Sequence, residues 1–202
     1  MLQELMQRGG PVMYPLLACS IVALTVITER LLFWLNLRKA RDPEGVQRML
    51  ELARRGQVID SLTEGRRLED PVARVLVRGL EQWPRSISEA LESQAREEVR
   101  QMRRYLGVLD TIITLAPLLG IYGTITGIIR AFGFLGAAAV PDPQAVAGGI
   151  AEALITTAAG LTIAIFCVPP YSFFSAKTEE MVHDVERQAT HLELLVQQAS
   201  RP

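Results

Sequence analysis

Glu152 and three threonines are the residues of this chain whose types and spacing could move a small ion. Glu152 and Thr156 are one helical turn apart and share a face, and Thr157 follows directly within the stretch "GGIAEALITTAAGLTIAI". A carboxylate inside a membrane span costs about 2.5–3.5 kcal/mol on insertion scales, so it normally faces the bundle interior or water. With Thr124 and Thr157, Glu152 and Thr156 could line a narrow polar track suited to a proton or a small cation.

Plainer interpretations of the same residues stay open. Glu152 lies near one end of its apolar stretch, where an inexpensive position at the membrane surface is an alternative to the bundle interior. A lone threonine in a membrane helix usually donates its hydroxyl back to a carbonyl of its own helix, which would explain Thr124 without any role in transport.

Small residues dominate one face of the preceding apolar stretch, "APLLGIYGTITGIIRAF". Small residues at steps of three and four let two membrane helices approach closely, and packing then drives their association. Arg130, near the end of this stretch, is expected to mark the outer boundary between membrane and water. The residues predicted to pack helices are Gly120, Gly123, Gly127 and, in the later stretch, Gly160.

Three uncharged stretches of the chain match the thickness of a bilayer. They run over residues 11–28, 111–129 and 153–176, and about 20 helical residues cross the hydrocarbon core. Residues 38–107 hold 15 of the 21 lysines and arginines, so this connection is expected in the cytoplasm. We therefore predict an all-α polytopic membrane protein with three spans, a periplasmic N-terminus and a cytoplasmic C-terminus.

The expected organisation has seven segments, of which the second and third spans extend into the cytoplasm. They are a short periplasmic N-terminus (1–10), the first transmembrane helix (11–37), a cytoplasmic helical region (38–107), the second transmembrane helix (108–135), a periplasmic loop (136–144), the third transmembrane helix (145–176) and a cytoplasmic C-terminal helix (177–202).

Helix signals in the cytoplasmic part are local and specific. Asp42-Pro43 and Asp70-Pro71 are N-cap and first-turn pairs, and "SISE" at residues 86–89 is a capping box. With no proline or glycine before Gly107, we expect one helix from about Ser88 into the second span. Apolar residues at steps of three and four continue from Val182 to Ala199, a seam that could pack on the same chain or between subunits.

Several classes of function are disfavoured by what the sequence lacks. It has no phosphate-binding glycine loop, no nucleophile with a base and no cluster of metal ligands, so we expect no enzyme, no metal and no cofactor. No basic helix suggests nucleic acid. Cys19 in "LLAC" resembles a lipoprotein signal, but the apolar run continues well past it, as in a retained helix.

A proton relay across a bilayer needs a group near the midplane that changes its charge. The chain offers no clear candidate, because Asp110 and Arg130 fall near the two ends of the second span. We infer that a partner protein supplies this titratable residue.

The two apolar motifs resemble the paired signatures of the ExbB/TolQ/MotA proton-channel family. The motifs are residues 116–132 and "VAGGIAEALITTAAGLTIAI" at residues 146–165, and the ExbB-like branch is nearest. Three spans, the "ER" at Glu29–Arg30 and the cytoplasmic connection agree, so the resemblance covers nearly the whole chain.

This resemblance implies a partner and a mechanism. Family members form homopentamers around a dimer of a single-span ExbD-like or TolR-like protein that carries a membrane aspartate. Proton flow is thought to rotate the dimer, and a TonB-like or TolA-like protein passes the motion to the outer membrane. The implied location is the bacterial inner membrane, among its lipids. By motif position the polar pore residues fall on Thr124, Glu152 and Thr157, whereas Thr156 stands where the family often has a small apolar residue.

One departure and several alternatives accompany the resemblance. The family usually has Ala-Ile-Pro in the third span, but here Phe166 takes the place of the proline, and Pro169-Pro170 follow. This substitution bears on the rotation of the helix beyond Ile165. A TolQ-like subunit for envelope maintenance, a flagellar-stator-like channel that could use sodium, and a passive membrane scaffold are the alternative functions.

Overall fold

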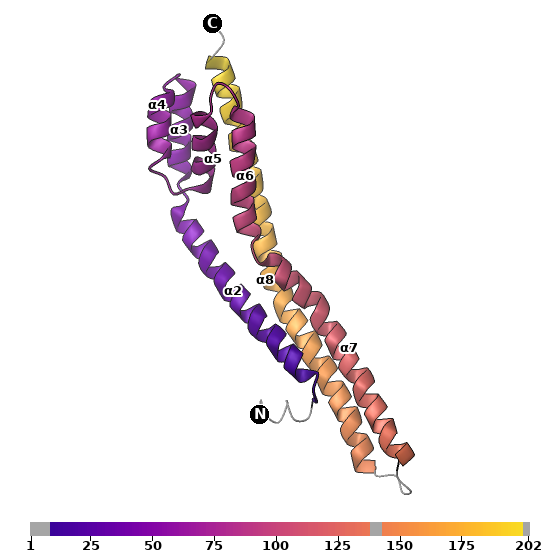
Figure 1. The fold of residues 1–202 in the computed structure, drawn as a ribbon. Helices are drawn as coiled ribbons and strands as arrows, with labels where there is room; N and C mark the ends of the chain where they lie inside the picture. Colours follow the sequence, from indigo (N-terminus) through magenta and orange to yellow (C-terminus); the bar gives the residue numbers. More distant parts are fainter. Residues whose placement is uncertain (1–8, 138–142, 200–202) are drawn as a thin grey trace. The chain divides into compact units, whose positions relative to one another are not determined.

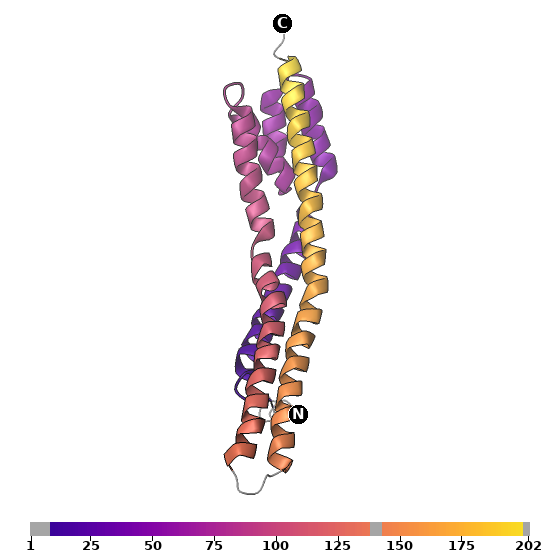
Figure 2. The same ribbon diagram turned by 90° about the vertical axis from the view of Figure 1, so that its right-hand side faces the viewer.

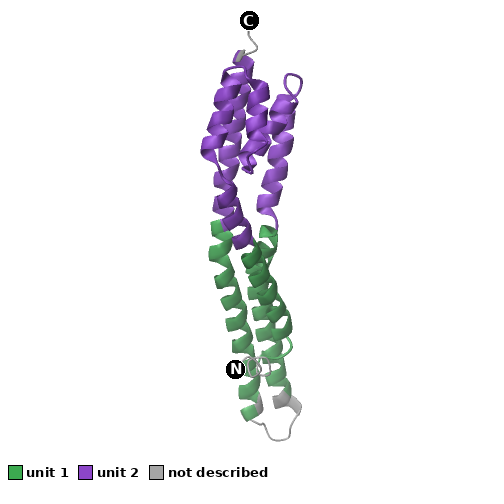
Figure 3. Ribbon diagram, turned by 90° about the vertical axis from the view of Figure 1, so that its left-hand side faces the viewer, with its two compact units in different colours: residues 1–29, 105–173 green, residues 30–104, 174–202 purple. Residues whose placement is uncertain are grey.

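Every element that the structure describes is an α-helix, as the sequence predicts. The computed structural model describes residues 9–137 and 143–199 (Figure 1). The chain divides into two compact units, coloured in Figure 3. Unit 1 comprises residues 1–29 and 105–173, and unit 2 comprises residues 30–104 and 174–202. The predicted N-terminal segment and periplasmic loop lie partly outside the described residues.

Unit 1 is built from three apolar helices. They are the first part of α2 (Met13–Ala40), α7 (Leu106–Ala137) and the first part of α8 (Pro143–Ala199). In Figures 1 and 2, α7 and the first half of α8 run side by side. The buried apolar residues at the core of this unit are Val12, Met13, Leu16, Ala23, Val26, Leu109, Ile112, Ala116 and Cys167.

Three helical stretches are long and apolar enough to cross a membrane: Met13–Ala40, Ile87–Gly133 and Val146–Gln198. Within the chain, no more than 28% of the most apolar part of each stretch is buried. So large an exposed apolar surface is unfavourable in water and is typical of contact with lipid or with other membrane helices. The chain is therefore a multi-pass membrane protein.

Unit 2 is a helical bundle with its own core. It contains α3 (Pro43–Arg54), α4 (Val58–Gly65), α5 (Pro71–Glu81), α6 (Ile87–Arg103) and the second part of α8. The seam predicted near the C-terminus lies within this core, where Val185, Leu192 and Val196 are buried. These residues pack on helices of their own chain, which is one of the two arrangements that the sequence left open.

Two of the three predicted helix starts are confirmed in their capping contacts. The Asp42 carboxylate accepts a hydrogen bond from the Gly45 amide (2.9 Å), and the Asp70 carboxylate accepts one from the Val72 amide (2.8 Å). Ser86 does precede the first residue of α6, but its side chain makes no capping hydrogen bond. The capping box predicted at residues 86–89 is therefore wrong.

The helix predicted to run unbroken from about Ser88 into the second span is interrupted. α6 ends at Arg103 and α7 begins at Leu106, and Tyr105 between them has a φ of 65°. The cause lies in a distant part of the chain. The buried Arg30 guanidinium donates to the carbonyls of Gln101 (3.0 Å) and Met102 (3.1 Å), which an unbroken helix would use for amides four residues later.

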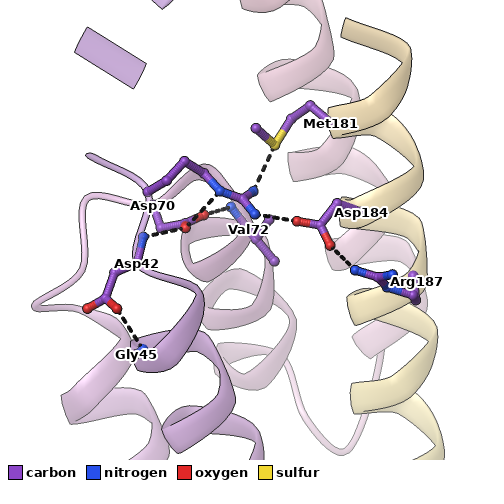
Figure 4. A network of polar contacts seen from close by, with 8 residues as sticks. Asp42, Gly45, Asp70, Val72, Met181, Asp184 and Arg187 are labelled. Atoms are coloured by element: carbon purple, nitrogen blue, oxygen red, sulfur yellow. Dashed lines mark hydrogen bonds and ion pairs between the residues drawn. The ribbon is translucent and has the colours of Figure 1, made fainter. Parts of the chain in front are cut away.

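A network of charged residues joins three segments of unit 2 (Figure 4). Arg41, just after α2, donates to the Asp184 carboxylate of α8 (2.5 Å) and forms an ion pair with Asp70 (3.4 Å). Asp70 is completely buried and also accepts from the Asp42 amide (2.9 Å). Burial alone would raise the pKa of Asp184, but the hydrogen bonds and charges of Arg41 and Arg187 outweigh it, so its pKa is lowered.

Candidate functional site

The backbones of α7 and α8 approach each other closely in unit 1 because glycines line the contact. A Cβ on Gly160 would overlap the carbonyl oxygen of Ala116, and one on Gly120 would lie 3.0 Å from the Thr156 carbonyl oxygen. Further along, a Cβ on Gly127 would lie 3.0 Å from the Gly149 carbonyl oxygen. Only glycine leaves room for such contacts, and the polar side chains on both helices are consequently held against the opposite backbone.

Gly160→Ala is expected to destabilise the pair of helices α7 and α8 by about 1–3 kcal/mol, because the added methyl group must push the backbones apart. The measurement is the thermal unfolding midpoint of the full chain in mild detergent. Gly148→Ala is the matched control, since nothing lies within 4 Å of a Cβ at that position of the same helix. Equal midpoints for the two variants would contradict this account of the contact.

Thr124 of α7 and Thr157 of α8 bring their hydroxyl groups into direct contact. Thr157 also lies 3.0 Å from the Gly120 carbonyl oxygen, and Thr124 lies 3.1 Å from the Ala153 carbonyl oxygen. A hydroxyl has one proton to donate, so these bonds form a chain with a direction. In one direction Thr124 donates to Thr157, which donates to Gly120. In the other, Thr157 donates to Thr124, which donates to the Ala153 carbonyl or to the Gly120 carbonyl of its own helix (3.2 Å).

This hydroxyl pair can reverse the direction of its hydrogen bonds but cannot store charge. The alternative directions of the chain are related by moving each hydroxyl hydrogen, and neither requires a helix to move. No acidic or basic residue occurs within residues 111–129 or 153–176, so the apolar parts of these two spans hold no charged group beside the pair. We call Thr124 and Thr157 the threonine pair.

Thr156 occupies a different place from the threonine pair. Its side chain is buried at the contact of the two helices, where a Cβ on Gly123 would lie 2.5 Å from the Thr156 hydroxyl oxygen. The hydroxyl donates within its own helix, to the carbonyls of Ala153 (2.8 Å) and Glu152 (3.2 Å). These contacts are those of a residue that packs two helices together.

Glu152 forms an ion pair with Arg130 across the two helices. The distance from the Arg130 Nη2 atom to the Glu152 Oε1 atom is 2.6 Å, and the Glu152 side chain is only 17% exposed. Sequence reasoning treated Arg130 as a boundary marker and missed this contact. A signal was present, because Arg130 and Glu152 are the only charged residues between Thr111 and Ala137 and between Pro143 and Ala176.

The spans and the polar contacts between them define a helical multi-pass membrane protein with a hydroxyl pair at the contact of two apolar helices and an ion pair that joins these helices. Among the described residues, no group of histidine, cysteine, aspartate or glutamate could hold a metal ion. Residues 67–187 match the MotA/TolQ/ExbB proton channel family. The chain belongs to this family of membrane channel subunits, which are not enzymes.

Three relatives illustrate the match. A putative biopolymer transport protein ExbB-like 1 of Synechocystis is 40% identical over 172 residues, which are 80% of this chain and 65% of the relative. A putative biopolymer transport protein ExbB homolog of Methanothermobacter thermautotrophicus is 32% identical over 186 residues, 91% of this chain and 66% of the relative. A Tol-Pal system protein TolQ of Haemophilus influenzae is 36% identical over 95 residues, 47% of this chain and 42% of the relative. The chain thus spans slightly less than two thirds of the first two relatives.

Proposed function

We propose that the chain is an ExbB-like subunit of an inner-membrane motor that uses the proton-motive force to energise TonB-dependent transport across the outer membrane. The observation that carries the proposal is the threonine pair, which is held between two apolar helices by glycine contacts. A threonine that serves only its own helix needs no acceptor on a neighbouring helix. Thr124 and Thr157 each also have an acceptor on the opposite helix, which stabilises the helix pair and places two hydroxyl protons side by side.

The pair acts as a relay in this proposal and needs a titratable partner. Hydroxyl groups hand on a proton without becoming charged themselves, so an acid must accept and release it. The chain offers none within the apolar parts of the two spans. The partner is a single-span ExbD-like or TolR-like dimer with an aspartate in its membrane helix, and a TonB-like protein receives the motion.

The outward surface of the spans supports assembly with further copies. Large apolar side chains on α7 are exposed in the single chain, among them Leu118 (56%) and Ile125 (52%). A homo-oligomer, which the family resemblance makes a pentamer, would cover part of this surface, and lipid would cover the rest. Each proton that crosses supplies about 2.3 kcal/mol per 100 mV of membrane potential.

The orientation follows from the distribution of basic residues. Unit 2 carries most of the lysines and arginines, so we place it in the cytoplasm and the Arg130–Glu152 ion pair at the periplasmic end of the spans. The inner membrane of a bacterium is the corresponding location.

A TolQ-like role in envelope maintenance is the second candidate. The similarity to the TolQ protein of Haemophilus influenzae supports it. It requires the same threonine pair and differs in the partner, which would be TolR-like.

The test of the proposal is the native mass of the complex in mild detergent, after co-expression with an ExbD-like or a TolR-like single-span protein. Five copies of this chain with two copies of one partner would support the motor and identify its branch. A monomer or dimer that retains neither partner would contradict the proposal and favour a passive scaffold.

A further inference from the structure

The ion pair between Arg130 and Glu152 is a built feature of the outer end of the spans. Their charged atoms are 2.6 Å apart, and Glu152 is the more buried partner, at 17% exposed against 42% for Arg130. Glu152 is also the only carboxylate that α8 contributes to its apolar part. A guanidinium stays protonated in a protein, so Arg130 places a permanent positive charge beside the Glu152 carboxylate.

A third segment of unit 1 closes around the same carboxylate. Gly10 precedes α2, and its carbonyl accepts a hydrogen bond from the Met13 amide (3.1 Å). A Cβ on Gly10 would overlap the Glu152 Oε1 atom, so the backbone of this turn lies directly against the carboxyl group. The Oε1 atom therefore has the guanidinium and the Gly10 turn as close neighbours.

Protons and alkali-metal cations place different demands on such a site. A metal cation must replace its hydration shell with several oxygen ligands, and at least one anionic ligand favours its binding. A proton needs a lone pair on one oxygen and a chain of hydrogen bonds. Arg130 occupies Glu152, the one carboxylate in the apolar parts of α7 and α8, whereas the threonine pair offers neutral oxygens that already hydrogen-bond to each other and to carbonyls.

We propose that Arg130 is a specificity-determining residue, which excludes sodium and other alkali-metal cations from the outer end of the pathway by occupying the Glu152 carboxylate. This inference rests on the proposed function, in which the chain and its partner conduct protons past the threonine pair. A clasp that merely held α7 and α8 together would use the same contact but would have no effect on ion selectivity.

The experiment compares Arg130→Gln with Glu152→Gln in the full chain, purified with its single-span partner and reconstituted in vesicles. Both variants break the ion pair, but only Arg130→Gln leaves a free carboxylate. A pH-sensitive dye and a sodium-sensitive dye inside the vesicles report the two ions. Sodium uptake by vesicles with Arg130→Gln is expected to rise at least about tenfold over wild type, equivalent to about 1.4 kcal/mol. Vesicles with Glu152→Gln are expected to take up no more sodium than wild type.

Two further variants at position 130 separate the effect of the charge from that of the side chain's shape. Arg130→Lys retains the charge and is expected to exclude sodium, and Arg130→Asn is a second neutral variant in case Arg130→Gln does not accumulate. If wild-type vesicles conduct protons but neither Arg130→Gln nor Arg130→Asn admits sodium, Arg130 does not determine ion selectivity. The proposed function would be unaffected by that result. Equal sodium leakage through Arg130→Gln and Glu152→Gln would reduce the pair to a structural clasp. Wild-type vesicles that conduct no protons would overturn the proposed function itself, and this role with it.

Discussion

Thr157→Val is expected to abolish proton-driven transport while the chain still assembles with its partner. Valine has nearly the shape of threonine but no hydroxyl, so the substitution removes the contact with Thr124 and the hydrogen bond to the Gly120 carbonyl. The Gly120 carbonyl keeps only Thr124 of its two hydroxyl neighbours, and Thr124 loses its side-chain partner on α8. The measurement is energised uptake by cells in which the variant is the sole copy of this subunit, alongside the native mass of the complex.

Thr162→Val is the matched control for this experiment. Thr162 lies on the same helix, and its exposed hydroxyl donates to the Ala158 carbonyl of its own turn (2.7 Å). We expect this variant to transport normally. Glu152→Ala should lose transport as Thr157→Val does, because it removes the carboxylate at the outer end. Normal uptake by both Thr157→Val and Glu152→Ala would remove these residues from the pathway.

Asp70→Ala is expected to have the largest effect on stability, lowering the free energy of unfolding of unit 2 by about 3 kcal/mol. The completely buried carboxylate accepts from the amides of Val72 and Asp42 and pairs with Arg41. Removing it leaves two amides without their acceptor and weakens the link through Arg41 to α8. Hydrogen exchange of the α5 amides in the detergent-solubilised chain is the measurement, with about a hundredfold acceleration expected.

Asp60→Ala provides the comparison for Asp70→Ala. Asp60 is likewise an acid near the start of a helix, in the first turn of α4, but it is exposed. We expect a change of no more than about 0.5 kcal/mol. Similar exchange rates in the two variants would show that the buried network contributes no more than an ordinary surface acid.

Local features of the chain were readable from the sequence because short-range physics decides them. The apolar stretches are long enough to cross a bilayer, and a run of about 20 apolar residues is typical of a membrane span. The helix starts at Asp42 and Asp70 were equally clear, since an N-cap contact joins residues two or three apart. The motifs around Gly120 and Glu152 were sufficient to suggest the family, which the match over residues 67–187 confirms.

Contacts between distant residues needed the tertiary structure. The helix is interrupted at Arg104 and Tyr105, just before Gly107, and the side chain that binds the carbonyls at the end of α6 there is Arg30, more than 70 residues earlier. The Ser86 side chain likewise makes no capping bond although its motif is complete. Local patterns cannot report which distant side chain competes for a backbone group.

The candidate site shows the same division. Residue types and spacing by themselves indicated that Thr124, Glu152 and Thr157 were unusual in apolar helices, because polar groups in a membrane are expensive. Only the close packing of α7 on α8 decided that the two threonines meet, that Thr156 packs against Gly123, and that Arg130 pairs with Glu152. The rotation of one helix against another depends on the whole contact surface, and that information is not carried by either helix alone.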